Sequence, residues 1–184
     1  MKITLLVGGG GDTYYELGLL SGLFVAGIHV DFIGSNYLRE KSILKDERVS
    51  FYNLRGDQNP GALLHEKIIR ILKYYIKLLK YAYKTDSKIF HIQWLSKFEY
   101  FDRIFVNAYF KLLGKKIVFT AHNVNARERD ENDSFLNKLT LMFFYRIIDN
   151  IIVHTDEMKI QLVENYNIDS SKISVIPYGI NNMV

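Results

Sequence analysis

The sequence predicts an α/β protein with a Rossmann-like, doubly wound parallel sheet of about seven strands and helices on both faces. Apolar, strand-like runs alternate with longer helix-like stretches from one end of the 184 residues to the other. Strands that alternate with helices of ten or more residues indicate βαβ units and hence a parallel sheet. The strand-like runs are also almost continuously apolar, as expected for strands that helices cover on both faces.

The order of elements follows from this alternation. The predicted strands are Lys2–Val7, His29–Ile33, Val49–Asn53, Ile89–Gln93, Lys116–Ala121, Asn150–His154 and Ile173–Ile176. The predicted helices are Thr13–Ala26, Ala62–Lys84, Phe98–Leu113, Asn132–Asp149 and Asp156–Tyr166. No internal repeat or low-complexity tract interrupts the series, so we expect one domain over residues 1–176.

Composition excludes several classes of protein. Hydrophobic residues make up 48% and charged residues 24%, and there are only two prolines, which is a globular composition. No apolar run approaches 18 residues, and the apolar segment Ile3–Val7 is shorter than that of a signal peptide, so we expect a cytoplasmic protein without a transmembrane helix. The absence of cysteine excludes disulfides and thiolate metal sites. No clustered histidines or carboxylates have metal-ligand spacing, so no metal site is predicted.

A glycine-rich loop follows the first predicted strand. Ligands of open α/β sheets bind beyond the carboxyl ends of the strands, which is where Gly8–Asp12 lies. Glycines allow a ligand to approach the backbone closely, and the N-terminus of the next helix favours phosphate. We therefore predict that Gly9, Gly10, Gly11 and Asp12 bind substrate. A tight turn without a ligand is the alternative.

The same loop does not have the dinucleotide-binding pattern. The fingerprint needs a third glycine and an acidic residue at the end of the second strand. Thr13 and Tyr14 stand where the third glycine would be, and Asp31 lies inside the second strand rather than at its end. A nucleotide-dependent oxidoreductase is therefore a disfavoured alternative.

Two further strands end in a histidine motif. The segment Ile89–Trp94 reads IFHIQW and contains His91, and the segment Phe119–Val124 reads FTAHNV and contains His122. Histidine at a strand end can donate a hydrogen bond to a hydroxyl or phosphate, or transfer a proton near neutral pH. A hydrogen-bonded structural histidine is the alternative at each position, and His154 is predicted to be a core residue.

These motifs resemble the glycosyltransferases of family four, which have the GT-B fold. The segments that carry the likeness, besides the glycine loop, are IFHIQW (89–94), VFTAHNV (118–124), IIVHTDEMKIQL (151–162) and KISVIPYGI (172–180). By this likeness Gly9–Gly11 approach the nucleotide-sugar diphosphate or the acceptor. His122 would contact the transferred sugar, with Asn123 beside it. His91, Trp94 and Thr155 occupy the corresponding strand-end motifs and are expected to bind substrate.

The resemblance also implies an activity. Members transfer a sugar, with retention of configuration, from a nucleoside diphosphate sugar, so the donor is a substrate and no cofactor is expected. The implied acceptor is a glycan or a lipid-linked molecule of polysaccharide or glycolipid biosynthesis. In the family the donor binds mainly to a C-terminal domain. Residues 177–184 are expected to begin the linker to that domain, which is absent, so the chain alone should be inactive or nearly so. A non-catalytic binding or membrane-docking subunit of a two-chain transferase is the alternative.

One predicted helix has a basic face. Lys67, Arg70, Lys73, Lys77, Lys80 and Lys84 fall within roughly 140° of helical arc. The apolar residues Ile68, Ile69, Ile71, Leu72, Ile76, Leu78 and Leu79 are expected to face the sheet. A face of one sign suits an anionic membrane, so Lys73, Lys77 and Lys80 are predicted to bind the membrane surface. A solvated face is the alternative, and nucleic acid is not expected because no recognition motif accompanies the charge.

Overall fold

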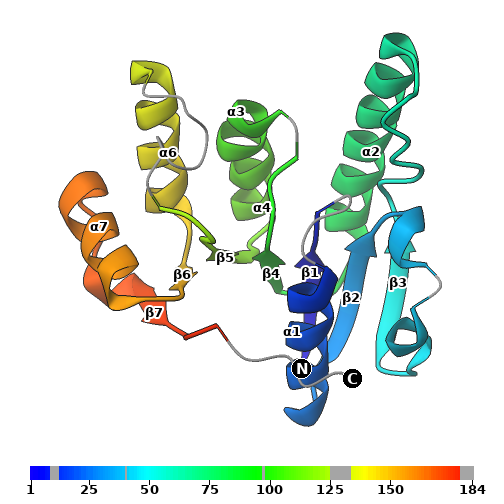
Figure 1. The fold of residues 1–184 in the computed structure, drawn as a ribbon, viewed down its shortest axis with the longest axis horizontal. Helices are drawn as coiled ribbons and strands as arrows, with labels where there is room; N and C mark the ends of the chain where they lie inside the picture. Colours follow the sequence, from blue (N-terminus) through cyan, green and yellow to red (C-terminus); the bar gives the residue numbers. More distant parts are fainter. Residues whose placement is uncertain (9–12, 40, 97, 125–133, 179–184) are drawn as a thin grey trace. The chain divides into compact units, whose positions relative to one another are not determined.

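The computed structural model describes residues 1–8, 13–39, 41–96, 98–124 and 134–178. Seven strands form one parallel sheet in the order β3-β2-β1-β4-β5-β6-β7 (Figure 1). The strands are β1 (Lys2–Leu6), β2 (His29–Gly34), β3 (Val49–Asn53), β4 (Ile89–Ile92), β5 (Lys116–Thr120), β6 (Asn150–Val153) and β7 (Ile173–Val175). Each strand begins at the predicted residue and ends within one residue of the prediction, which confirms the parallel α/β fold class.

The helices also follow the prediction, with one change. They are α1 (Thr13–Val25), α2 (Leu64–Lys84), α3 (Glu99–Phe101), α4 (Asn107–Leu112), α6 (Phe135–Ile147) and α7 (Asp156–Tyr166). A π-helical turn, Asp102–Val106, joins α3 to α4, so the helix predicted over Phe98–Leu113 forms with a widened turn inside it. Such turns are frequent at functional sites.

The chain divides within β4 into two compact units, and the first of them comprises residues 1–90. In this unit α1 packs on one face of β1 and β2, because alternate residues of a strand point to opposite faces. The buried residues of this layer are Ile3, Leu5, Val7, Leu20, Phe24, Val30, Phe32, Leu38 and Leu44. Thr4 and Asp31, which alternate with these strand residues, point to the other face, where α2 lies.

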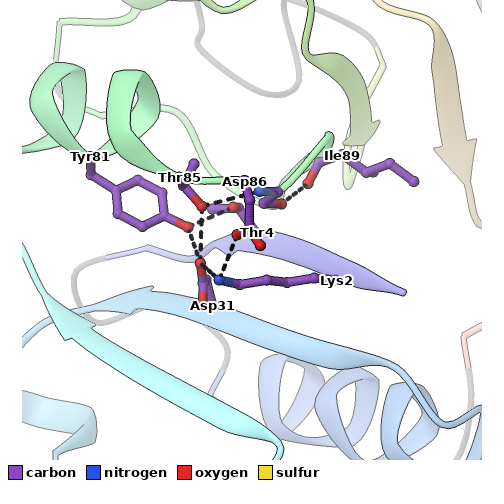
Figure 2. Close-up of polar contacts among 8 residues, drawn as sticks. Lys2, Thr4, Asp31, Tyr81, Thr85, Asp86 and Ile89 are labelled. Atoms are coloured by element: carbon purple, nitrogen blue, oxygen red, sulfur yellow. Dashed lines mark hydrogen bonds and ion pairs between the residues drawn. The ribbon is translucent and has the colours of Figure 1, made fainter.

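Figure 2 shows a polar network where α2 meets that face. The buried Asp31 carboxylate accepts a hydrogen bond from the Tyr81 hydroxyl (2.6 Å) and one from Thr85 (3.2 Å), and Lys2 Nζ lies 3.0 Å from it. Thr4 Oγ1 is 2.8 Å from the Tyr81 hydroxyl oxygen. Burial, together with the hydrogen bond to Asp31, raises the pKa of Tyr81 far above its ordinary value. The network therefore joins β1, β2 and the last turn of α2 through charged and neutral hydrogen bonds.

The orientation of α2 differs from the prediction. Its buried residues are Tyr74, Tyr75, Leu78, Tyr81 and Ala82. Leu72 and Ile76 are each 55% exposed, and Ile68 and Ile69 are exposed as well, so the prediction that these four residues face the sheet is wrong. The physical reason is that the sheet face carries Asp31 and Thr4, which need hydrogen-bond partners that a tyrosine supplies and an isoleucine cannot. Lys73, Lys77, Lys80 and Lys84 are exposed, as predicted.

The second unit comprises residues 91–180. Phe119 of β5 packs edge-on against Phe144 of α6, with 4.9 Å between the ring centroids. Arg103, in the π-helical turn, is fully buried and donates to Asn137 Oδ1 (2.6 Å) and Thr140 Oγ1 (3.3 Å) of α6. It also pairs with Glu99 one turn earlier. The buried guanidinium therefore fixes the start of this helical segment against α6.

Candidate functional site

A small pocket lies in the second unit at the carboxyl ends of β4 and β5. Its volume is about 160 Å³. The lining residues are Gln93, Trp94, Leu95, Glu99, Phe119, Thr120, His122 and Asn123. This is the sheet edge at which ligands of α/β proteins bind. Three of the residues predicted to bind substrate (Trp94, His122 and Asn123) thus line one pocket.

His122 lies at the centre of a cluster of aromatic rings. Its imidazole stacks flat on the Trp94 indole, with 4.4 Å between centroids and 7° between planes. The Tyr178 hydroxyl oxygen is 3.4 Å from His122 Nδ1, and the His154 ring lies 5.5 Å from that of His122. His154 is buried, as predicted, and its Nδ1 donates to the Ile176 carbonyl oxygen at 2.9 Å. The stack and the neighbouring rings hold the His122 imidazole in a defined plane.

His91 lies behind the pocket rather than in its wall. The Gln93 side-chain amide donates to His91 Nε2 (2.8 Å) and to Thr120 Oγ1 (3.2 Å), and His91 Nε2 is 2.9 Å from Thr120 Oγ1. Burial lowers the pKa of His91 to about 4, and the nearby His122 contributes in the same direction. His91 is therefore neutral at pH 7, with Nε2 as an acceptor. In the structure it orients Gln93, and its predicted contact with substrate remains a prediction.

Two polar atoms of the pocket residues lack partners in the described part of the chain. Gln93 Oε1 and Trp94 Nε1 are both buried and form no hydrogen bond there. The first is an acceptor and the second a donor, and buried polar atoms are normally satisfied. Sugar hydroxyls both donate and accept, so a bound sugar can satisfy both atoms.

The other predicted site residues divide into two groups. Thr155 N-caps α7, where its Oγ1 accepts from the Met158 N–H at 3.2 Å, and it does not line the pocket. Its predicted contact with substrate remains a prediction. Gly9, Gly10, Gly11 and Asp12 lie outside the described residues. Beside them, the Gly8 N–H donates to the buried Glu16 carboxylate at 3.1 Å.

Sequence reasoning missed three polar residues of the pocket, Gln93, Thr120 and Glu99. Gln93 and Thr120 stand inside the two histidine motifs, and their polarity within apolar strand ends was an available signal. Glu99 comes from the helix after β4 and is positioned by its pairing with Arg103. Nothing in the sequence indicates that pairing beyond the four-residue spacing.

A comparison with protein families matches residues 8–182 to the model of Glycosyltransferase Family 4. The chain belongs to glycosyltransferase family 4. This confirms the resemblance seen in the strand-end motifs. A search of curated protein sequences gave no significant match.

Solved structures of other glycosyltransferases share the fold of this family 4 chain. A sucrose-phosphate synthase from Thermosynechococcus elongatus matches 98% of the chain at 15% identity, with a TM-score of 0.63. MurG of Acinetobacter baumannii matches 99% at 15% identity, with a TM-score of 0.56. HepE of Anabaena, solved with UDP and glucose, matches 97% at 11% identity, with a TM-score of 0.59.

The family 4 chain spans about half the length of these structures, covering 48%, 46% and 44% of them respectively. At these identities the likeness shows the fold alone. The fold is that of the N-terminal Rossmann-like domain of GT-B glycosyltransferases.

Proposed function

We propose that this domain takes part in transferring a sugar, with retention of configuration, from a nucleoside diphosphate sugar to a glycan or lipid-linked acceptor in polysaccharide or glycolipid assembly. The observation that carries the proposal is the pocket at the ends of β4 and β5. There His122, Trp94 and Gln93 offer a polar contact, an aromatic surface and unsatisfied hydrogen-bonding atoms together. The donor is a substrate, and the proposal needs no cofactor.

The size of the pocket supports a division of labour between two domains. Sites for drug-sized ligands have volumes of about 300–1,000 Å³. A pocket of about 160 Å³ is smaller, so it suits one sugar ring rather than a whole nucleoside diphosphate sugar. We therefore propose that the nucleotide and its diphosphate bind to a second domain, in cis or, as the alternative, on a partner chain, and that this domain alone turns over little or not at all.

The proposed reaction needs no general acid or base among the described residues. Retaining transfer passes through an oxocarbenium-like transition state. The donor-binding domain would stabilise the diphosphate that leaves. His122 is proposed to hydrogen-bond the transferred sugar as charge develops, which is most effective in a site that excludes water. Gln93 and Trp94 would bind further hydroxyls and fix the sugar beside it.

Calorimetric titration with a panel of nucleoside diphosphate sugars tests the proposal. The 184-residue chain is expected to bind them with a Kd above about 1 mM, and a version extended through any coding sequence that follows is expected to bind one of them at least tenfold more tightly. Tight binding by the 184-residue chain would contradict the proposal, because it would show that the donor site lies in this domain rather than in a second one. Nicotinamide dinucleotides serve as the control, because their binding would favour the oxidoreductase alternative.

We also propose that α2 attaches the domain to the cytoplasmic face of an anionic membrane. No helix in the described part of the chain has the length and apolar character to cross a bilayer. On α2, however, the exposed Lys73, Lys77 and Lys80 border the exposed Leu72 and Ile76. A helix face that is basic on one side and apolar on the other is typical of interfacial attachment.

Reversing the charge of this face is expected to abolish attachment. Each basic residue near an anionic surface contributes about 1 kcal/mol, so the triple variant Lys73→Glu, Lys77→Glu, Lys80→Glu should bind phosphatidylglycerol vesicles at least about 100-fold more weakly. Cosedimentation measures this directly. The matched control reverses three exposed lysines elsewhere, Lys41, Lys45 and Lys88, with the same change in net charge. Equal losses in the two triple variants would show non-specific attraction, and unchanged binding would contradict the proposal.

A further inference from the structure

A second pocket is formed entirely by the first unit, and the proposed reaction assigns it no role. Its volume is about 550 Å³, and it lies between the loop that follows β3 and the first two thirds of α2. The lining residues are Leu54, Arg55, Gly56, Asp57, Asn59, Ala62, Glu66, Ile69, Arg70, Lys73 and Lys77. None of them belongs to the residues predicted to bind the sugar.

The pocket has an excess of unpaired positive charge. Four of its side chains are basic, Arg55, Arg70, Lys73 and Lys77, and none of these forms an ion pair with another described residue. The two acidic side chains already accept hydrogen bonds from the backbone. Glu66 accepts from the Leu63 N–H (2.9 Å), and Asp57 accepts from the Asn59 N–H (3.1 Å). Four basic side chains against two carboxylates therefore leave the pocket with an excess of positive charge.

Arg55 is held in place before any ligand binds. Its guanidinium lies 4.6 Å from the centroid of the Tyr74 ring, in a cation–π contact. Its Nε is buried and has no hydrogen-bond partner among the described residues. A rigid, planar guanidinium with an unused donor matches the oxygen atoms of a phosphate, which it can bind with two parallel hydrogen bonds.

The loop around Arg55 is ordered by its own hydrogen bonds. Asn53 Oδ1 accepts from the Gly56 N–H at 2.9 Å, and Gly56 has a φ of +67°, a conformation that favours glycine. The Gln58 side-chain amide donates to the Arg55 carbonyl oxygen at 2.9 Å. The basic wall that this loop contributes is therefore built into the fold.

We propose that this pocket binds a phosphate group, carried by a phosphomonoester or phosphodiester. Phosphate binding itself does not depend on the transferase function. The assignment of the ligand as the acceptor does rest on that function: a phosphate-bearing acceptor would be held here by Arg55 and Arg70. Its source is either a lipid phosphate or a water-soluble phosphate ester, which share the same recognition chemistry.

The test uses the protein with three probes, namely inorganic phosphate, glycerol 3-phosphate and dihexanoyl phosphatidate, each followed by backbone amide NMR shifts. All three are expected to shift the amides of Arg55 and Gly56 in a saturable way. Arg55→Gln and Arg70→Gln should each raise the Kd at least tenfold. Lys88→Gln, at an exposed lysine of the same unit that lies outside the pocket, should leave it unchanged. Phosphatidate binding at least tenfold tighter than glycerol 3-phosphate identifies a lipid source, and equal affinities identify a soluble ester.

Several outcomes would overturn the inference. These are an absence of saturable shifts with all three probes, or a loss of affinity in Lys88→Gln equal to that in the arginine variants. Because Arg55→Gln also removes the contact with Tyr74, thermal unfolding checks its fold, and the half-buried Arg70 carries the test if that variant does not fold. Phosphate binding in an extended chain that binds no nucleoside diphosphate sugar would retain this pocket and contradict the transferase proposal, so the two failures are distinguishable.

Discussion

Replacing His122 with alanine is expected to lower kcat/KM for sugar transfer by about 100- to 1,000-fold, the usual effect of removing one hydrogen-bond donor that acts on developing charge. The expectation rests on the position of the imidazole. It lines the pocket, stacks at 4.4 Å on Trp94 and has the Tyr178 hydroxyl 3.4 Å from Nδ1. A ring held in this way needs little reorganisation when it meets a sugar hydroxyl, so its removal should affect the transition state more than the fold.

The measurement is steady-state transfer by the extended enzyme, with the donor identified by titration. His122→Asn keeps a side-chain donor and should therefore transfer sugar faster than His122→Ala. If the role of His122 were purely structural, the asparagine variant would have no such advantage over the alanine variant. His29→Ala is the matched control, because His29 is exposed at the start of β2, in the first unit. If kcat/KM of the His122→Ala enzyme were within threefold of the wild-type value, His122 would have no role in the transfer.

The strands were predictable because their signal is local. Each is a short apolar run bounded by polar or glycine residues, and β3 and α7 form over the predicted residues without any change. Topology added the next step. Since parallel strands end at one edge of a sheet, Trp94 and His122 could be expected near each other although 28 positions separate them in the sequence.

The orientation of α2 could not be obtained from the apolar pattern. Tyr81 combines an apolar ring with a polar hydroxyl, and its inward orientation is favourable because Asp31 on the facing strand accepts a hydrogen bond from that hydroxyl. The apolar pattern therefore predicts that the isoleucine and leucine side chains face the sheet. In the structure the helix is rotated about its axis so that tyrosine side chains face the sheet instead. This rotation leaves Leu72 and Ile76 beside the basic residues, which the sequence pattern did not suggest.

The candidate site was predictable in part for a related reason. His122, Trp94 and Asn123 are strand-end residues, and the strand ends were predicted to within one residue. His91 is one residue before the end of β4, where the surrounding elements bury it, so it supports Gln93 from behind. Glu99 enters the pocket wall from a helix, in partnership with Arg103, and such side-chain pairings depend on tertiary packing that a periodicity does not encode.

Replacing Asp31 with alanine is expected to lower the free energy of unfolding by about 3–5 kcal/mol, because it removes the hydrogen bonds from Tyr81 and Thr85 to a buried carboxylate, which contribute about 1.5–3 kcal/mol each. Asp31 is 1% exposed and bonded to Tyr81, Thr85 and Lys2, so the variant leaves the buried Tyr81 hydroxyl without its carboxylate acceptor. Burial lowers the pKa of Lys2, but its hydrogen bonds to Asp86 and Asp31 outweigh that effect and raise it. Urea unfolding followed by circular dichroism measures the change.

The same lysine offers an internal control, because it also pairs with Asp86 at 2.9 Å. The Asp86 side chain is 81% exposed, so Asp86→Ala should cost no more than about 1 kcal/mol. Tyr81→Phe removes one hydroxyl and leaves the carboxylate its other partners, for an expected loss of about 1–3 kcal/mol. Asp31→Ala and Tyr81→Phe combined should cost less than the sum of the two, because both remove the same 2.6 Å hydrogen bond. Equal losses for Asp31→Ala and Asp86→Ala would show that the charge on Lys2, rather than the buried network under α2, determines the stability of this unit.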